Sequence, residues 1–157
     1  ELDVVLDWAV GGTPEGDPAR VPPAVPLNNT WADAKPDLVL RPAAPFQIPA
    51  DTMEATYDFV LTAGAAPERT ITALDLLPGT PAVVRDATIS VRTADGASTI
   101  IGHWTPQQTP APIAVTPGAA LPPGADLIAH MHYKKTWKYE GQALTAQSAL
   151  GLYFAEQ

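Results

Sequence analysis

The chain has 157 residues, with 18 prolines, 11 glycines, no cysteine and a net charge of −8. This length supports one domain with one core, and the missing cysteine excludes disulfides, thiolate metal ligands and covalent haem attachment within these residues. Basic residues cluster no further than Lys134, Lys135 and Lys138, which disfavours nucleic acid as a partner, and no apolar run approaches the roughly 20 residues of a membrane span.

The amino-terminal part of the chain is expected to hold a short helix and then a linker. Apolar residues recur at helical spacing over residues 1–10, and Gly11 and Gly12 end the pattern, so residues 1–12 form the helical unit. Residues 13–36 are rich in proline and have no periodic apolar face. This composition predicts an extended linker that lies on a surface and is anchored by Trp31.

Residues 37–157 read as one domain made of many short strands. Proline and glycine turns separate the apolar segments at spacings of about ten residues, which is typical of an antiparallel β-sandwich because parallel strands would need helices between them. The fold class expected is therefore all-β, an antiparallel jelly-roll-like β-sandwich. The expected strands lie within residues 37–41, 46–50, 56–62, 69–77, 87–93, 98–104, 113–116, 126–135 and 148–155.

All three histidines are candidate metal ligands. His130 and His132 are two apart in an expected strand, so their side chains share one face, and His103 ends another expected strand. Two or three imidazoles on a rigid face can bind copper or zinc. The alternative is that these histidines only form hydrogen bonds on a sandwich surface. Met131 lies between the pair and points to the opposite face, which makes it a core residue.

The aromatic residues near the lysines are candidate binding residues. Trp137 and Tyr139, with the lysines beside them, could form a cation–π surface for a partner, and Trp31 is the candidate partner contact of the linker. Trp104, Trp137 and Tyr139 could instead form a platform for carbohydrate. The simpler interpretation is a hairpin whose long side chains cover apolar surface.

No catalytic residue is identified from the sequence. The chain has no Gly-x-Ser-x-Gly elbow and no glycine-rich phosphate loop before a helix. Asp75, Asp86 and Asp126 fall on different expected segments and are interpreted as solvated charges. Whether the chain is an enzyme is left open, with a non-enzyme favoured.

The order of segments between Pro36 and Ala155 resembles a known family. These segments are PDLVLRPAAPFQIPAD at residues 36–51, the stretch over 69–91 that contains LLPGTPAVVRD, GHWTPQ at 102–107, LPPGADLIAHMHYKK at 121–135 and SALGLYFA at 148–155. They are similar to the copper type II, ascorbate-dependent monooxygenases, and most of all to the amino-terminal copper domain of peptidylglycine α-hydroxylating and dopamine β-monooxygenases. The resemblance implies a jelly-roll-like β-sandwich.

The ligand positions that the resemblance implies are only partly kept. Where the family has a His-His pair, this chain has Arg85 and Asp86, and the later His-Tyr that supplies the third copper ligand is His132-Tyr133. Arginine has no lone pair for copper and its fixed charge opposes a cation. The family also uses two such domains, and only one fits here. Hydroxylation by this chain alone is therefore not expected.

The first residues resemble the exit of another domain. The segment LDVVLDWAVGGTPEGD at residues 2–17 is similar to the last helix of a c-type cytochrome, so a haem cofactor is expected only if a cytochrome domain precedes Glu1. The resemblance implies a periplasmic or otherwise extracytoplasmic bacterial protein.

Two functions follow from these patterns. The leading hypothesis is a non-catalytic accessory or scaffolding module without a cofactor, whose partner is a protein in an extracytoplasmic or membrane-attached redox complex. The alternative hypothesis is a copper- or zinc-binding electron-transfer domain with a rebuilt site at His130, His132 and His103.

Overall fold

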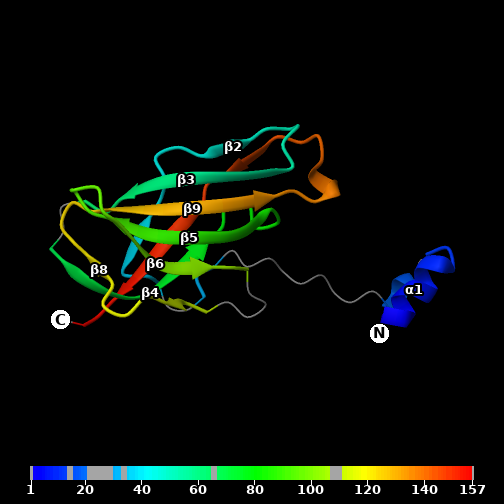
Figure 1. Ribbon diagram of the computed structural model, residues 1–157, viewed down its shortest axis with the longest axis horizontal. Coiled ribbons are helices and arrows are strands. Elements are labelled where there is room, and N and C mark those ends of the chain that lie inside the picture. The colour runs from blue at the N-terminus through cyan, green and yellow to red at the C-terminus, as the bar shows by residue number, and fades with distance from the viewer. Residues whose placement is uncertain are drawn as a thin grey trace.

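The computed structural model describes residues 2–13, 16–20, 30–32, 35–64, 67–106 and 111–156. Within them the chain forms one α-helix, two short 3₁₀ turns and strands that pair antiparallel (Figure 1). The elements are α1 (Leu2–Val10), η1 (Pro18–Arg20), β1 (Leu38–Leu40), β2 (Phe46–Ile48), β3 (Glu54–Thr62), β4 (Arg69–Leu77), β5 (Val84–Arg92), β6 (Ser98–Trp104), β7 (Ile113–Ala114), β8 (Ala120–Leu121), β9 (Asp126–Lys134), η2 (Trp137–Tyr139), β10 (Leu144–Ala146) and β11 (Ala149–Phe154).

The strands form an all-β sandwich, as the sequence predicts. One layer is a four-stranded sheet in the order β3-β9-β5-β6, which faces the viewer in Figure 1. The other layer follows the order β1-β11-β4-β7, with β8 also paired to β4, and will be called the five-stranded sheet. A two-stranded ribbon, β10-β2, lies beside them. In the described part of the chain every pairing is antiparallel, and β5 and β6 form a hairpin across a short turn.

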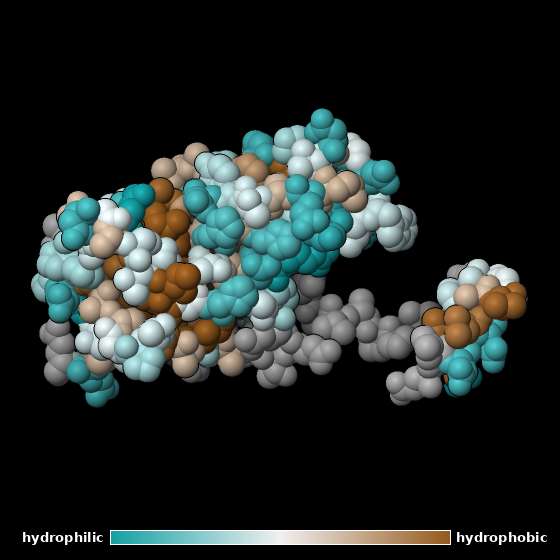
Figure 2. All heavy atoms as spheres, viewed as in Figure 1, coloured by the Kyte–Doolittle hydropathy of each residue, from teal (hydrophilic) through white to brown (hydrophobic). Residues whose placement is uncertain are grey.

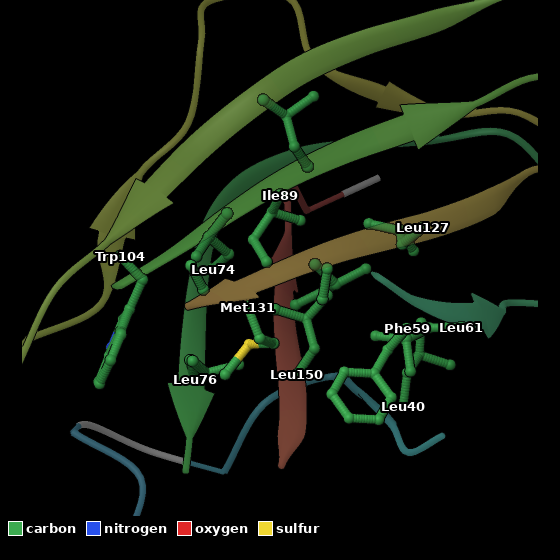
Figure 3. Packing of buried hydrophobic residues seen from close by; sticks show 14 of the residues in the cluster. Leu40, Phe59, Leu61, Leu74, Leu76, Ile89, Trp104, Leu127, Met131 and Leu150 are labelled. Atoms are coloured by element: carbon green, nitrogen blue, oxygen red, sulfur yellow. The ribbon is translucent and has the colours of Figure 1, made fainter. Parts of the chain in front are cut away.

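The core lies between the two large sheets (Figure 3). Side chains alternate along each strand, so β9 sends Leu127, Ala129, Met131 and Tyr133 inward and its intervening residues outward. Met131 is fully buried, as its position between two outward-facing histidines predicts. The inward-facing residues of the five-stranded sheet pack against them; among these are Leu74 and Leu76 on β4 and Leu150 and Leu152 on β11.

Two parts of the strand assignment need correction. Strands β8 and β10 were not expected, because segments of two or three residues carry too little alternation to be recognised. The aromatic stretch after β9 is the 3₁₀ turn η2 rather than a hairpin, with the Tyr139 N–H donating to the Thr136 carbonyl at 2.9 Å.

Part of the linker crosses the outer surface of the five-stranded sheet. Of residues 13–36, positions 14–15, 21–29 and 33–34 lie outside the described residues. Trp31 and Pro36 lie directly over Gly151 of β11, where a Cβ atom would come within 3.0 Å of the Trp31 ring and 2.5 Å of Pro36 Cγ. The Ala32 N–H donates to Asp75 Oδ2 at 2.8 Å. Residues 30–32 and 35–36 will be called the strap.

The strap bears on two interpretations. Trp31 packs on the sheet, which agrees with its predicted role as the anchor of the linker, while its role as a partner contact stays a prediction. Asp75 is 5% exposed rather than solvated, and its burial raises the pKa of its carboxyl group. The sequence gives no sign of this, because the partner of Asp75 is a backbone N–H that lies 43 residues away.

Helix α1 agrees with the sequence in its bounds. Its residues 3–10 are exposed, including Val4 and Val10. No helix in the described part of the chain is long and apolar enough to cross a membrane.

Candidate functional site: the histidine face of the four-stranded sheet

All three histidines lie on the outer surface of the four-stranded sheet. The register places His130 opposite Asp58 of β3 and Thr88 of β5, and Thr88 opposite His103 of β6. One row across four strands therefore carries two histidines. His132 lies one row away, opposite Asp86 of β5. This surface, the histidine face, comprises Glu54, Thr56, Asp58, Asp86, Thr88, His103, His130, His132 and Lys134.

The surface is divided into a polar half and an apolar half. In Figure 2 the hydrophilic residues gather over the end of the sheet where β9 terminates, and hydrophobic ones lie toward its other end. The apolar half contains the row formed by Val60, Ile128, Ser90 and Ile100, in which Val60 is 47% and Ile100 is 62% exposed. Beyond this row, Arg92 and Asp126 form an ion pair at 2.8 Å.

His132 is held between two carboxylates from the strands on either side. Its Nδ1 donates to Asp86 Oδ2 at 2.8 Å and its Nε2 donates to Glu54 Oε1 at 2.9 Å. A neutral ring could donate from only one of these nitrogens, so the two carboxylates favour the doubly protonated imidazolium form. The bond to Asp86, followed by the bond to Glu54, raises the pKa of His132 above its usual 6.5. We call this three-strand group the carboxylate clasp.

Glu54 completes the clasp with a second cation. Its Oε2 atom accepts from Lys134 Nζ at 3.0 Å, and the bonds from Lys134 and His132 lower the pKa of the Glu54 carboxyl group. Arg85, the neighbour of Asp86, donates to the Lys134 backbone carbonyl at 2.9 Å. The two positions where the resemblance places a His-His pair therefore bear an arginine bonded to backbone and an aspartate bonded to His132.

The other two histidines bond to different strands. His130 Nδ1 donates to Asp58 Oδ1 on β3, whereas His103 Nδ1 is 3.2 Å from Thr88 Oγ1 on β5. The structure thus brings the three predicted ligands to one face and gives each ring its own partner. Among the residues described, no group of three or more histidine, aspartate or glutamate side chains is arranged to hold a metal ion. A family-type copper site does not fit Arg85, Asp86 and His132, while the rebuilt site stays a prediction.

The aromatic candidates are placed in different environments. Trp137 on η2 is 85% exposed, whereas Tyr139 packs against the core and has Lys138 Nζ 5.7 Å from its ring. Trp104 is 8% exposed and belongs to the core. The carbohydrate platform of three aromatic rings is therefore wrong, since one of its members is buried.

Sequence reasoning missed the acidic partners of the histidines. Glu54 and Asp58 alternate onto the same face of β3, a pattern that is visible in the sequence, but only the register of β3 with β9 shows which histidine each one meets. Asp86 and Asp126, interpreted as solvated, pair with His132 and Arg92. A scan against protein-family models and a search of the curated proteins found no match for this chain.

Proposed function

We propose that this chain is a non-catalytic β-sandwich module that binds a protein partner in an extracytoplasmic redox assembly. The observation that carries the proposal is the carboxylate clasp. At the position where the resemblance implies a copper ligand, both nitrogens of His132 donate hydrogen bonds to carboxylates. An imidazolium has no lone pair for a metal, so the clasp uses this residue to join three strands.

The clasp also accounts for the pair of residues that replaces His-His. Asp86 supplies the acceptor for His132, and Arg85 donates to the backbone carbonyl of Lys134. Together with the Lys134–Glu54 ion pair, these residues form a connected polar surface in which each member has a partner. Beside this polar surface lie the exposed apolar side chains of Val60 and Ile100, and apolar area bordered by a polar rim is the arrangement of a protein–protein interface.

The test is metal content, measured by mass spectrometry on protein purified without chelators and then loaded with Cu²⁺ or Zn²⁺. The matched variant carries His130→Ala and His132→Ala. We expect metal far below one equivalent in both proteins. Near-stoichiometric metal that is lost in the variant would overturn the proposal. Cross-linking of the protein in its native compartment then reports whether cytochrome-type proteins are among its neighbours.

The second candidate is a copper- or zinc-binding electron-transfer domain. It is favoured by one observation, the placing of His103, His130 and His132 on one face within two neighbouring rows. For this function His132 would have to lose a proton and leave at least one carboxylate. Asp86→Asn with Glu54→Gln weakens the clasp, so tighter Cu²⁺ binding in that double variant than in the wild type would favour this candidate.

A further inference from the structure

Strand β3 forms one edge of the four-stranded sheet, and it is long and regular. It has nine residues and contains no proline. Its register with β9 runs without a shift from Glu54 to Thr62, while the pairings of β5 with β6 and with β9 are both interrupted. A long, flat edge strand presents unpaired backbone groups and invites another strand to pair with it.

The other sheet edges are protected or short. Strand β6, at the opposite edge, lies next to a register shift, and its Ile101 carbonyl accepts the Thr116 N–H at 2.9 Å. In the five-stranded sheet the outer strands β1 and β7 have three and two residues. The β10-β2 ribbon, which runs beside β3 in Figure 1, contacts it through the rings of Phe46 and Tyr57 and forms no backbone bond with it. In the described part of the chain, β3 is therefore the one long edge whose outward backbone groups have no strand or loop bonded to them.

The backbone groups that face this edge can be assigned. Lys135 N–H donates to the Met53 carbonyl at 2.8 Å, and these residues continue the register in which Glu54 meets Lys134. Met53 is thus in a hydrogen-bonded pair, and such pairs alternate along antiparallel strands. The N–H and C=O groups of Thr56, Asp58 and Val60 consequently point away from β9. Across the described residues, no backbone group bonds to them on that side.

The side chains along the edge indicate the chemistry of an added strand. Asp58 is 62% exposed at its side chain, and its ion-pair partner His130 lies on the β9 side. Tyr57 is 42% exposed on the other surface and stacks on Phe46 with 4.3 Å between ring centroids. A basic residue opposite Asp58 and an apolar residue beside Tyr57 would complement both surfaces.

A second copy of this chain is a poorer occupant than a basic segment. Full antiparallel overlap of two β3 strands about a two-fold axis places Asp58 opposite Asp58 of the other copy, and like charges directly opposite each other are destabilising. Each copy also carries a net charge of −8. Charge complementarity therefore selects an extended segment of a different protein, with lysine or arginine at alternate positions.

We infer that β3 is a docking edge where an extended basic segment of a partner protein adds as a fifth strand to the four-stranded sheet. The inference rests on the proposed function in one respect, that the partner is a protein. Main-chain hydrogen bonds to Thr56, Asp58 and Val60 would hold the segment, and the alternating side chains would select it.

The probe is a capped nine-residue peptide of alternating valine and lysine, added to the ¹⁵N-labelled full chain. A peptide with glutamate in place of lysine is the control. We expect the lysine peptide to slow amide hydrogen exchange at Thr56, Asp58 and Val60, and the glutamate peptide to leave it unchanged. Protection spread over other surfaces, or absent with both peptides, would overturn the inference.

A matched pair of variants at Val60, with a third at Asp58, separates strand addition from simple charge attraction. Val60→Pro removes an N–H that faces the open edge and costs no bond to β9, since proline is tolerated where an edge strand faces solvent. We expect it to weaken binding about tenfold or more, while Val60→Thr keeps the N–H and binds as the wild type does. Equal binding by both variants would refute strand pairing. Asp58→Lys should reverse the preference to the glutamate peptide.

The oligomeric state of the free protein, measured by sedimentation, tests whether a second copy of the chain occupies the β3 edge. A monomer supports the inference, whereas a dimer that Val60→Pro dissociates would assign the edge to a second copy and overturn it. The proposed function fails on a different result, bound metal at the histidines, which leaves the exchange data on β3 unaffected.

Discussion

Replacing Gly151 by alanine tests whether the strap is a fixed part of the fold. An added Cβ atom would lie 2.5 Å from Pro36 Cγ and 3.0 Å from the Trp31 ring, both closer than packed atoms approach. Overpacking of this kind costs about 1–3 kcal/mol. Replacing glycine by alanine in an unstrained position has the opposite effect and stabilises by about 0.4–1 kcal/mol through the unfolded state.

These two effects predict that Gly151→Ala lowers the free energy of unfolding when the strap contacts are present and raises it when they are removed. With the strap intact, Gly151→Ala should destabilise the protein by roughly 1–2 kcal/mol, or about 0.5–1 M in the urea midpoint. In a background carrying Trp31→Ala and Pro36→Gly the contacting atoms Trp31 Cζ3, Pro36 Cγ and Pro36 Cβ are gone, so the same substitution should stabilise by about 0.4–1 kcal/mol.

Urea unfolding followed by far-ultraviolet circular dichroism gives the four free energies of this cycle. The strand conformation of β11 is common to all four proteins, so the difference reports the strap alone. Effects of Gly151→Ala that agree within about 0.5 kcal/mol in the two backgrounds would refute the contact between strap and sheet.

Three further predictions concern buried or paired side chains. The pKa of His132 is raised, so its bonds stabilise the fold fully below pH 6.5 and this stabilisation is lost as the pH rises through the pKa of the folded protein. The pKa of Glu54 is lowered, so the stabilisation from its carboxylate is present above pH 4.5 and is lost on acidification. The melting temperature of the wild type minus that of His132→Gln should therefore be largest between pH 4.5 and pH 6.5, and a difference independent of pH would contradict the clasp. Burial raises the pKa of Asp75, so ionisation of its carboxyl group disfavours the folded state and the wild type should gain stability on acidification. Asp75→Asn should remove this gain, and carboxyl ¹³C shifts of the wild type should give a pKa above 3.8. Lys135 is 4% exposed, and its ammonium group donates to the Pro49, Ala50 and Gln142 carbonyls. Lys135→Met should therefore lower the free energy of unfolding in urea by roughly 2–4 kcal/mol and free the loop before β3. A decrease under about 0.5 kcal/mol would show that water replaces the ammonium group.

The clasp and the edge of β3 lie on one strand, which links the two proposals physically. Glu54 ties the start of β3 to His132, and Asp58 ties its middle to His130. These side-chain bonds all run toward β9, so they fix β3 in its register and leave its far side for another strand. Conditions that weaken the clasp should therefore also loosen the first residues of the docking edge.

The alternation of residues along the chain was sufficient to predict the fold class and most strands. The prediction for residues 69–77 and 98–104 coincides with β4 and β6, because each has alternating or apolar residues between turn signals. It also put His130 and His132 on one face and Met131 in the core. These results follow from local rules, since a strand alternates its side chains wherever it lies.

The partners of these side chains were decided by the tertiary structure alone. The Asp75–Ala32, Asp58–His130 and Asp86–His132 contacts join residues that are 43, 72 and 46 positions apart. Their formation depends on strand order and register, and a shift of one residue would turn every side chain of a strand to the other face. The sequence by itself determined which residues point outward together, and the pairing of strands determined that His132 meets two carboxylates and that β3 lies at an open edge.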